Sequence, residues 1–421
     1  MASRRPRALH RIGAVATVAS SLSPTQPQHR RHDFADLTVV AACFLTLTLS
    51  TLFLGVMTFS RHLSSGRDYI VYWSTGQQLV HHANPFDPVV MGRIEHDAGY
   101  DGKPGSFYMR NPPWGLPLAL PLGYTGSRIG ALPWSLLMLA IVLYSVRTLW
   151  IMFGKPRSEF VWLGLCFPPA LQCVLMGQTS IFVLLGLVLF LRLYRTQPFC
   201  AGAALWFCTL KPHLSLPIGL ILLLWIALTR SYKILLGLAA ALAVSCAVTW
   251  LIDPLAFTQY AQWAHRSGIS NEFIPCLSVA LRNLIDPSAK WLAFVPSVLG
   301  GIWAVFYFWP RRHTWDWLEH GSLVMLVSIL VAPYCWIYDQ SLALPAVLYA
   351  LWRASSRWPV AILAALYIVV ELQGFWSHNG LASRWYLWPA VAWVVWFVWT
   401  LARPKPAGEA PALTPQTASA G

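Results

Sequence analysis

One acidic residue stands where the chain leaves its first long apolar run. Asp68 lies at the start of the segment SSGRDYIVYWSTGQQLVHHANPFDP, and its spacing to Tyr72 is that of a helix. We expect this segment to form a helix that lies along the outer surface of a membrane and ends near Asn84. A carboxylate at a lipid boundary gains basicity when it is partly buried, which suits a general base that deprotonates a hydroxyl. The alternative is a plain helix-end anchor in which Asp68 pairs with adjacent Arg67.

Further polar islands stand at the ends of apolar runs, where each is costly unless it meets a partner or a water-filled cavity. They are Gln178 in MGQTS, Lys211 in TLKPHL, Arg282 in CLSVALRNL, and Tyr338 with Asp339 in APYCWIYDQ. Lys211 needs an anion, for which a lipid-linked phosphate is natural, or it snorkels to the interface. Gln178 can equally hydrogen-bond a neighbouring helix, and Arg282 can pair with Asp286.

Tyr72 and Tyr108 are placed to stack on sugar faces, although an interfacial aromatic belt gives the same pattern. The histidines His81, His82 and His96 do not follow a zinc-binding spacing, and the eight cysteines form no CxxC pair. We therefore expect no metal and no other cofactor.

The composition is that of a membrane protein. The 421 residues are 57% hydrophobic and only 11% charged, whereas a soluble protein carries about a quarter charged residues. A spanning helix needs about 20 mainly apolar residues. We predict an all-α polytopic bundle of about twelve spans, with a range of ten to thirteen because some runs are short. The runs are 37–59, 131–153, 158–175, 178–196, 199–210, 212–229, 233–252, 291–309, 317–333, 339–352, 358–376 and 385–402.

The distribution of charge sets the orientation. The Pro-rich stretch 112–123 is apolar but only about half a span long, and we interpret it as re-entrant or interfacial. With the N-terminus in the cytoplasm, the inner side then carries a net charge of +13 and the outer side +1. This bias follows the positive-inside rule and accounts for the total of +14 without a nucleic-acid partner. Counting 112–123 as a span would instead place the basic pairs outside.

Three regions follow from this topology. Residues 1–36 are expected to be a basic, disordered cytoplasmic tail, 37–403 the integral membrane domain, and 404–421 a second disordered cytoplasmic tail. The outer loops 60–112 and 253–290 are long and are expected to carry interfacial helices, whereas the inner connections are short. Chemistry is therefore expected on the outer face of the inner, or plasma, membrane, with both termini in the cytoplasm.

The order of these motifs resembles glycosyltransferase family 87, whose members use polyprenyl-phosphate sugars and have the membrane fold called GT-C. The resemblance runs from about Asp68 to Asp339, and its elements are specific only in combination. They are RDYIVYWSTGQQLVHHANPFDP, FYMRNPPWGLPLALPLG, MGQTSIFVLLGLVLF, FCTLKPHLSLPIGLILL, CLSVALRNL and APYCWIYDQSLALPA.

The resemblance implies a mechanism. In such enzymes the acidic residue of the first outer loop is the catalytic base, and Asp68 matches that position. The base would deprotonate a hydroxyl of a glycolipid or envelope glycan, which attacks the anomeric carbon of a hexose, best known as mannose, with inversion. Basic groups would stabilise the leaving phosphate without a divalent metal. The expected donor- and substrate-binding residues are Lys211, Arg282, Gln178, Tyr338, Asp339, Tyr72 and Tyr108. Some members have a histidine where this chain has Tyr338-Asp339.

A transporter or flippase of a lipid-linked sugar is the alternative function. It shares the apolar body and an outer anion site, but it predicts matched halves, helices broken near the midplane and ionisable residues within spans. Most charges here stand at span ends, and both long loops lie on one side. This asymmetry favours the enzyme.

The charge asymmetry predicts that both termini and the loop at Arg311-Arg312 face the cytoplasm. In intact cells, an impermeant thiol reagent is expected to label a cysteine placed near Asp97 and to leave one placed at Arg311 unlabelled. The opposite labelling pattern would reverse the topology.

Overall fold

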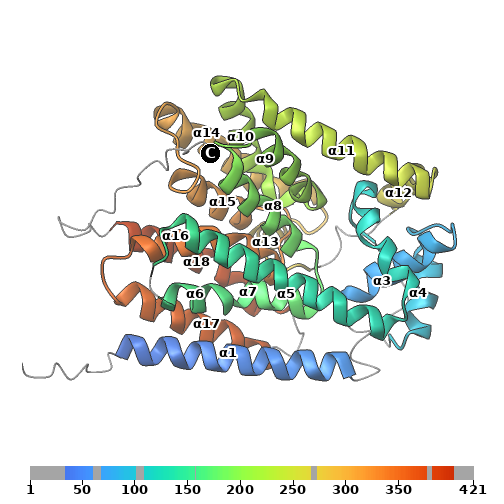
Figure 1. Cartoon of the computed structure of the whole chain (residues 1–421), viewed down its shortest axis with the longest axis horizontal. Helices are drawn as coiled ribbons and strands as arrows, with labels where there is room; N and C mark the ends of the chain where they lie inside the picture. Colours follow the sequence, from blue (N-terminus) through green and yellow to red (C-terminus); the bar gives the residue numbers. More distant parts are fainter. Residues whose placement is uncertain are drawn as a thin grey trace, which may run out of the picture. The chain divides into compact units, whose positions relative to one another are not determined.

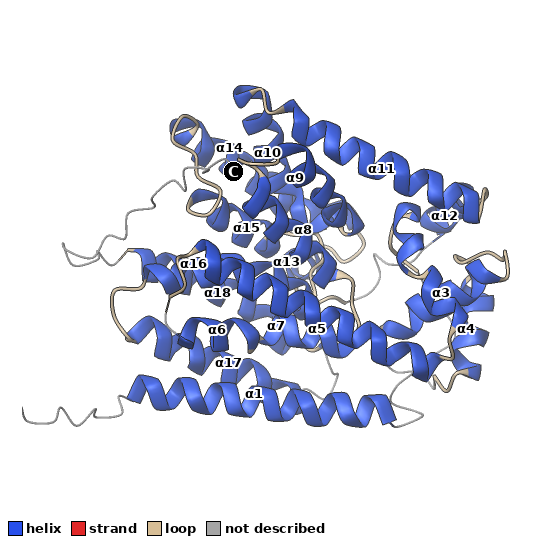
Figure 2. Cartoon of the chain, in the orientation of Figure 1, coloured by secondary structure: helices blue, strands red, loops and turns tan. Residues whose placement is uncertain are grey.

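The computed structural model describes residues 34–59, 68–100, 109–156, 158–266, 273–376 and 382–402. Within these residues all regular structure is helical and no strand occurs (Figure 2). Residues 34–36 of the predicted N-terminal tail belong to the first helix, and the rest of both predicted tails lies outside the described residues.

Figure 1 shows the α-helices in chain order. They are α1 (Phe34–Phe59), α3 (Tyr69–Val80), α4 (Pro88–Asp97), α5 (Ser127–Met152), α6 (Ser158–Leu165), α7 (Pro168–Met176), α8 (Ser180–Leu193), α9 (Pro198–Ala204), α10 (Leu216–Thr229), α11 (Tyr232–Ile252), α12 (Ala256–Arg266), α13 (Leu277–Ile285), α14 (Val295–Phe308), α15 (His320–Leu330), α16 (Leu344–Arg353), α17 (Trp358–Trp376) and α18 (Trp388–Leu401). Short 3-10 helices join them: η1 (Pro113–Leu118), η2 (Leu120–Tyr124), η3 (Leu205–Leu210), η4 (Pro212–Ser215), η6 (Lys290–Phe294), η7 (Trp309–Arg311), η8 (Ile337–Ala343) and η10 (Arg384–Leu387).

Five described helical stretches are long and apolar enough to cross a membrane: Ser127–Met152, Glu159–Met176, Pro212–Thr229, Tyr232–Ile252 and Lys290–Arg311. Five shorter apolar ones accompany them: Thr38–Leu52, Ser180–Leu193, Pro198–Leu210, His320–Leu330 and Trp358–Gln373. This architecture fits an all-α membrane protein, but the predicted count of about twelve spans is not confirmed. One reason is that predicted spans such as 199–210 and 339–352 change from one helix type to another within their length.

Large apolar side chains cover the outer faces of several helices. Leu251 on α11 and Phe306 on α14 are 73% and 75% exposed. Such surfaces are unfavourable in water and favourable in lipid. Inside the bundle, α1 packs on α17, α5 on α8, α9 on α11, and α10 on α14.

The helix predicted after Asp68 is present as α3, but it does not lie on the surface. Nine of its twelve residues are buried, because the Pro-rich stretch covers it. That stretch, predicted to be re-entrant or interfacial, forms the short helices η1 and η2. The backbones of Gly76 in α3 and Gly123 in η2 approach so closely that neither position has room for a Cβ atom.

The two predicted outer loops meet in the structure. Phe86, between α3 and α4, packs its ring edge-on against Tyr260 of α12, with ring centroids 5.3 Å apart. Helix η1 is tied to α11, where the hydroxyl of Thr249 donates to the carbonyl of Pro113 at 2.9 Å. The described parts of the two predicted outer loops therefore lie side by side where Phe86 meets α12, and α12 also packs on η1.

A left-handed turn joins α7 to α8 beneath α3. Gly177 has φ +76°, and the indole nitrogen of Trp134 donates to its carbonyl at 2.9 Å. A Cβ atom on Gly177 would lie 2.6 Å from the Cβ of Tyr69. Only glycine combines this backbone conformation with so close an approach, and the approach brings the start of α3 against the residue that follows, Gln178.

We expect Gly177→Ala to destabilise the protein more than Gly154→Ala does. Gly154 has nearly the same φ, +75°, but no atom lies within 4 Å of its missing Cβ. The Gly154 variant therefore measures the left-handed backbone cost alone, about 1–2 kcal/mol, and steric overlap adds about 1–3 kcal/mol at Gly177. Thermal unfolding in detergent measures both, and equal losses would contradict the role of the Tyr69 contact.

Candidate active site

The carboxylate of Asp68 is not used to cap its own helix. Asp68 is the N-cap residue of α3, yet its side chain accepts no capping hydrogen bond. It accepts a hydrogen bond of 2.7 Å from the side-chain nitrogen of Gln178. Asp87 shows the usual arrangement, since its carboxylate caps α4 by accepting from the backbone N–H groups of Val89 and Val90. Asp68 is thus held by a residue 110 positions further along the sequence. Arg67, its predicted alternative partner, lies outside the described residues.

Gln178 connects Asp68 to the other polar islands. Its Nε2 also lies 3.4 Å from the hydroxyl of Tyr338, to which it donates. Its Oε1 accepts from Nζ of Lys211 at 3.0 Å and from the hydroxyl of Tyr72 at 3.1 Å. The amide thereby uses both its donor and its acceptor capacity. Four predicted site residues from distant parts of the sequence thus meet at the side chain of a fifth, Gln178.

Lys211 has its anion within the protein. Its ammonium forms an ion pair with Oδ1 of Asp339 at 2.7 Å and donates to Oγ of Ser180 at 2.8 Å. With the bond to Gln178, all three of its N–H donors are used. The pair is well buried, with 12% of the Lys211 side chain and 1% of the Asp339 side chain exposed. A donor phosphate would therefore have to replace one of these partners.

Asp339 is held on both oxygens. Oδ1 also accepts from the hydroxyl of Ser180, and Oδ2 accepts from the backbone N–H of Trp336 at 2.9 Å. The latter bond holds the first turn of η8, whose N-cap residue is Trp336. Asp339 is thus a fixed counter-charge for Lys211, whose ammonium also lies 5.2 Å from the ring centroid of Tyr338.

Burial is the main influence on the pKa of Asp68. Desolvation raises this pKa, while the hydrogen bond from Gln178 and the charges of Lys211 and Arg110 lower it in part. The net effect is a raised pKa and therefore a carboxylate more basic than that of an ordinary aspartate. Asp68 as a whole residue keeps partial exposure.

Arg110 and Asn111 belong to the site although neither was singled out from the sequence. Besides Asp68, the charge of Arg110 acts on Tyr334 and Tyr338. The amide of buried Asn111 donates to Oγ1 of Thr179 at 3.2 Å, beside the hydroxyl of Tyr72. Both residues stand among apolar neighbours, between Met109 and Pro112, as Lys211 does. The motif FYMRNPPWG was the available signal.

The structure does not bring every predicted residue into the cluster. Arg282 is buried on α13, where it donates to the side chain of Asn283 at 3.4 Å, and no hydrogen bond or ion pair between described residues joins it to Lys211 or Asp68. Tyr108 lies outside the described residues. In the described part of the chain, no three His, Cys, Asp or Glu side chains are grouped so that they could hold a metal ion.

Comparison with known proteins shows the family. The profile of glycosyltransferase family 87 matches residues 108–333, which is more than half of the chain. The chain belongs to glycosyltransferase family 87. This confirms the resemblance seen in the sequence. No curated protein and no solved structure matches the chain.

The family match places Gln178, Lys211 and Arg282 within the matched residues and leaves Asp68 and Asp339 outside them. A glycosyltransferase needs a group that activates the acceptor and a surrounding that stabilises the departing anion. In this family 87 protein the described cluster offers the carboxylate of one partly exposed residue, Asp68, with cationic groups beside it.

We expect the Lys211–Asp339 pair to behave as one unit. Lys211→Met or Asp339→Asn leaves a buried charge without its partner, so each is expected to lower the free energy of unfolding by about 3–5 kcal/mol. The double variant should lose clearly less than the sum. Denaturation of monodisperse protein in detergent measures all three.

The pair Arg195–Asp316 provides a matched control. Its N···O distance is 2.9 Å, but 67% and 30% of the two side chains are exposed. Arg195→Gln is therefore expected to change stability by only about 0–1 kcal/mol. Additive effects of the two buried substitutions would contradict a direct coupling between Lys211 and Asp339.

Proposed function

We propose that the protein transfers a hexose from a polyprenyl-phosphate-linked donor to a hydroxyl of a glycolipid or envelope glycan, with inversion at the anomeric carbon. Mannose is the first sugar to test, as the family resemblance implies. The observation that carries this proposal is the carboxylate of Asp68. Asp68 is a partly exposed residue whose carboxylate is not used as a helix cap, is oriented by Gln178, and is made more basic by burial.

The proposed step is a single displacement. Asp68 accepts the proton of the acceptor hydroxyl while the hydroxyl oxygen forms a bond to the anomeric carbon of the donor. The bond from that carbon to the phosphate oxygen breaks, and its electron pair leaves with the polyprenyl phosphate. Gln178 keeps the carboxylate in place, because the hydroxyl of Tyr72 donates to its amide oxygen and fixes the amide.

Cations beside Asp68 suit the leaving phosphate. Arg110 is partly exposed and acts electrostatically on Asp68 and Tyr338. Lys211 can contribute by exchanging its bond to Gln178 for one to a phosphate oxygen, while Asp339 and Ser180 keep it in position. We therefore add Arg110 to Lys211 as a proposed phosphate ligand. Arg282 remains a predicted ligand without a described contact to this cluster.

An apolar cavity among three helices suits the isoprenoid chain of the donor. It has a volume of about 460 Å³ and is lined by α13, α14 and α15, from Leu277 to Val331. The backbone of Val331 is fixed by the hydroxyls of Ser278 and Ser297. Tyr334, three residues after Val331, stacks its ring on that of His213, with ring centroids 3.7 Å apart. His213 is two residues after Lys211 in the sequence. Val331 thus connects the cavity, through Tyr334 and His213, to the segment that carries Lys211.

The same proposal includes the membrane in which the enzyme lies and its orientation there. We place the enzyme in the inner membrane with both termini cytoplasmic and the Asp68 cluster on the outer face. The charge bias of the sequence supports this orientation. The reaction as written needs no metal ion.

Asp68→Asn tests the proposed function most directly. The substitution keeps the shape of the side chain and removes its basicity, so turnover should fall by about 10²–10⁴-fold. Transfer from polyprenyl-phosphate mannose to a panel of glycolipid acceptors measures it, as labelled product and released polyprenyl phosphate. The base must be ionised, so wild-type kcat/KM should decrease as the pH is lowered. Because the pKa of Asp68 is raised, the midpoint of this decrease should lie at a pH above the ordinary Asp pKa of about 3.9. The variant should lack this pH limb.

The control is Asp87→Asn, which alters a carboxylate that only caps α4 and should leave turnover unchanged, since asparagine caps helices equally well.

The stability of Asp68→Asn distinguishes a catalytic base from a residue that only anchors the end of α3. Because the folded-state pKa of Asp68 is raised, its ionised form costs stability above that pKa, and Asp68→Asn should be at least as stable as the wild type at neutral pH. Normal turnover in a folded Asp68→Asn protein would refute the assignment.

A further inference from the structure

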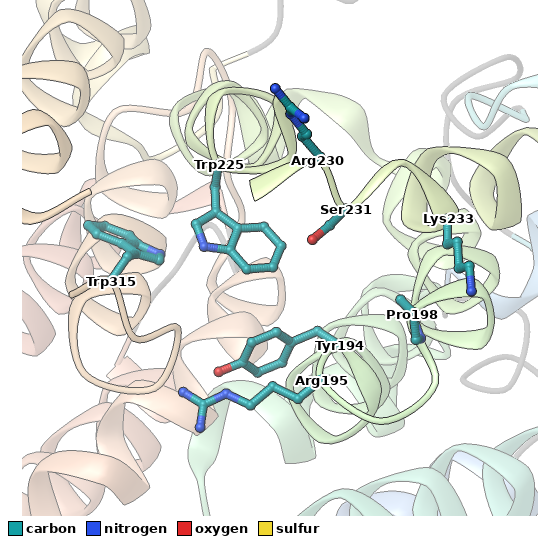
Figure 3. A pocket seen from close by; sticks show the side chains of 8 residues that line it. All are labelled: Tyr194, Arg195, Pro198, Trp225, Arg230, Ser231, Lys233 and Trp315. Carbon is teal, nitrogen blue, oxygen red and sulfur yellow. The ribbon is translucent and has the colours of Figure 1, made fainter. Parts of the chain in front are cut away.

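A second polar site lies at the other ends of two helices that reach the Asp68 cluster. Helix α8 begins at Ser180, in the cluster, and ends next to Tyr194 and Arg195, while α10 follows Lys211 and ends at Arg230. A cavity of about 420 Å³ opens among these distal ends, with three cationic side chains and three aromatic rings (Figure 3). Those side chains are Arg195, Arg230, Lys233, Tyr194, Trp225 and Trp315.

The cavity has an excess of positive charge. Arg195 pairs with Asp316 at 2.9 Å, and its guanidinium carbon lies 5.2 Å from the ring centroid of Tyr194. Arg230 and Lys233 form no ion pair with any carboxylate among the described residues. Arg230 also has φ +56°, a left-handed conformation that glycine adopts more easily. Two cations therefore remain for an anionic ligand.

A buried donor also faces this space. Trp315 is 8% exposed, and its Nε1 has no hydrogen-bond partner in the described part of the chain. Figure 3 draws this nitrogen on the side of the indole ring that faces Trp225, across the cavity. A buried N–H group normally has an acceptor, and an indole can only donate. The missing partner is thus an acceptor, which a phosphate oxygen provides.

We propose that this cavity binds the phosphate headgroup of an anionic phospholipid in the leaflet opposite the Asp68 cluster. Arg230 and Lys233 would contact the phosphate, and Trp315, which Figure 3 shows on the opposite side of the cavity, would donate to another oxygen of the lipid headgroup. The acyl chains would lie along the apolar surface beside the cavity, where Leu228 and Leu236 are exposed. Basic pockets between membrane helices on the cytoplasmic side are suited to anionic headgroups, and the charge bias of the sequence places these loops on that side.

Native mass spectrometry of the full-length protein in neutral detergent tests the proposal. The probes are phosphatidylglycerol and phosphatidylcholine with the same acyl chains, and inorganic phosphate as a competitor. Phosphatidylglycerol should bind at least about tenfold more tightly than phosphatidylcholine. The double variant Arg230→Gln/Lys233→Gln should lose about 10- to 100-fold in affinity for it, because two charge-assisted contacts are removed.

The matched control removes the same charge elsewhere. Arg147 and Arg192 are exposed cations that do not line the cavity, and Arg147→Gln/Arg192→Gln should change the affinity less than about twofold, since exposed charges contribute little. Trp315→Phe keeps the ring packing and should weaken binding about three- to tenfold through the lost N–H. This variant also provides a test if the double variant does not fold.

Three results would overturn the proposal. They are equal binding of the two lipids, wild-type affinity in both cavity variants, and displacement of phosphatidylglycerol by inorganic phosphate at millimolar concentration. The last result would assign the cavity to a soluble phosphate. Because binding rather than sugar transfer is measured, the outcome is independent of the proposed function.

Discussion

The side-chain amide of Gln178 keeps the two charges of the site apart. Its nitrogen meets Asp68 at 2.7 Å and its oxygen meets Lys211 at 3.0 Å. If the ammonium paired directly with Asp68, the pKa of that carboxyl would fall and its use as a base would be lost. Lys211 pairs with Asp339 instead, and burial keeps the pKa of Asp68 raised although the charge of Lys211 lowers it in part. The two aspartates therefore have different electrostatic environments within one cluster.

This arrangement depends on breaks in the helices. Gln178 follows the left-handed turn at Gly177, Lys211 stands between η3 and η4, and Asp339 is in the first turn of the 3-10 helix η8. Each break lets a polar side chain from the end of one apolar run reach across to another. Proline contributes at one of these points, because Pro212 directly follows Lys211 and lacks the backbone N–H that a continuing helix requires. The polar atoms released in this way are satisfied by side chains of the cluster.

Contrast of residue type made part of this site predictable. Gln178, Lys211 and Asp339 stood out as polar residues among apolar neighbours, and Tyr72 by its helical spacing from Asp68. Their pairing was not predictable, because Lys211 and Asp339 are 128 positions apart and only the folded chain shows that the cation already has a carboxylate. The sequence also gave no sign that the Pro-rich stretch covers α3, since the close approach of Gly76 and Gly123 leaves no pattern along the chain. Helix composition was predictable, but the number of spans was not, because 3-10 segments interrupt apolar runs.

The short length of α8 has a consequence for the depth of the polar cluster in the membrane. Its 14 residues correspond to a rise of about 21 Å at 1.5 Å per residue, whereas the hydrocarbon layer is about 30 Å thick. The polar groups at its two ends, Ser180 and Arg195, cannot both lie at the water interfaces of an undistorted membrane. Because ten of the 14 residues of α8 are buried inside the protein, the bilayer need not become thinner around this helix: polar groups at membrane depth are tolerated where protein encloses them. The short helix thus allows the polar cluster at Ser180 to lie below the membrane surface without contact with lipid.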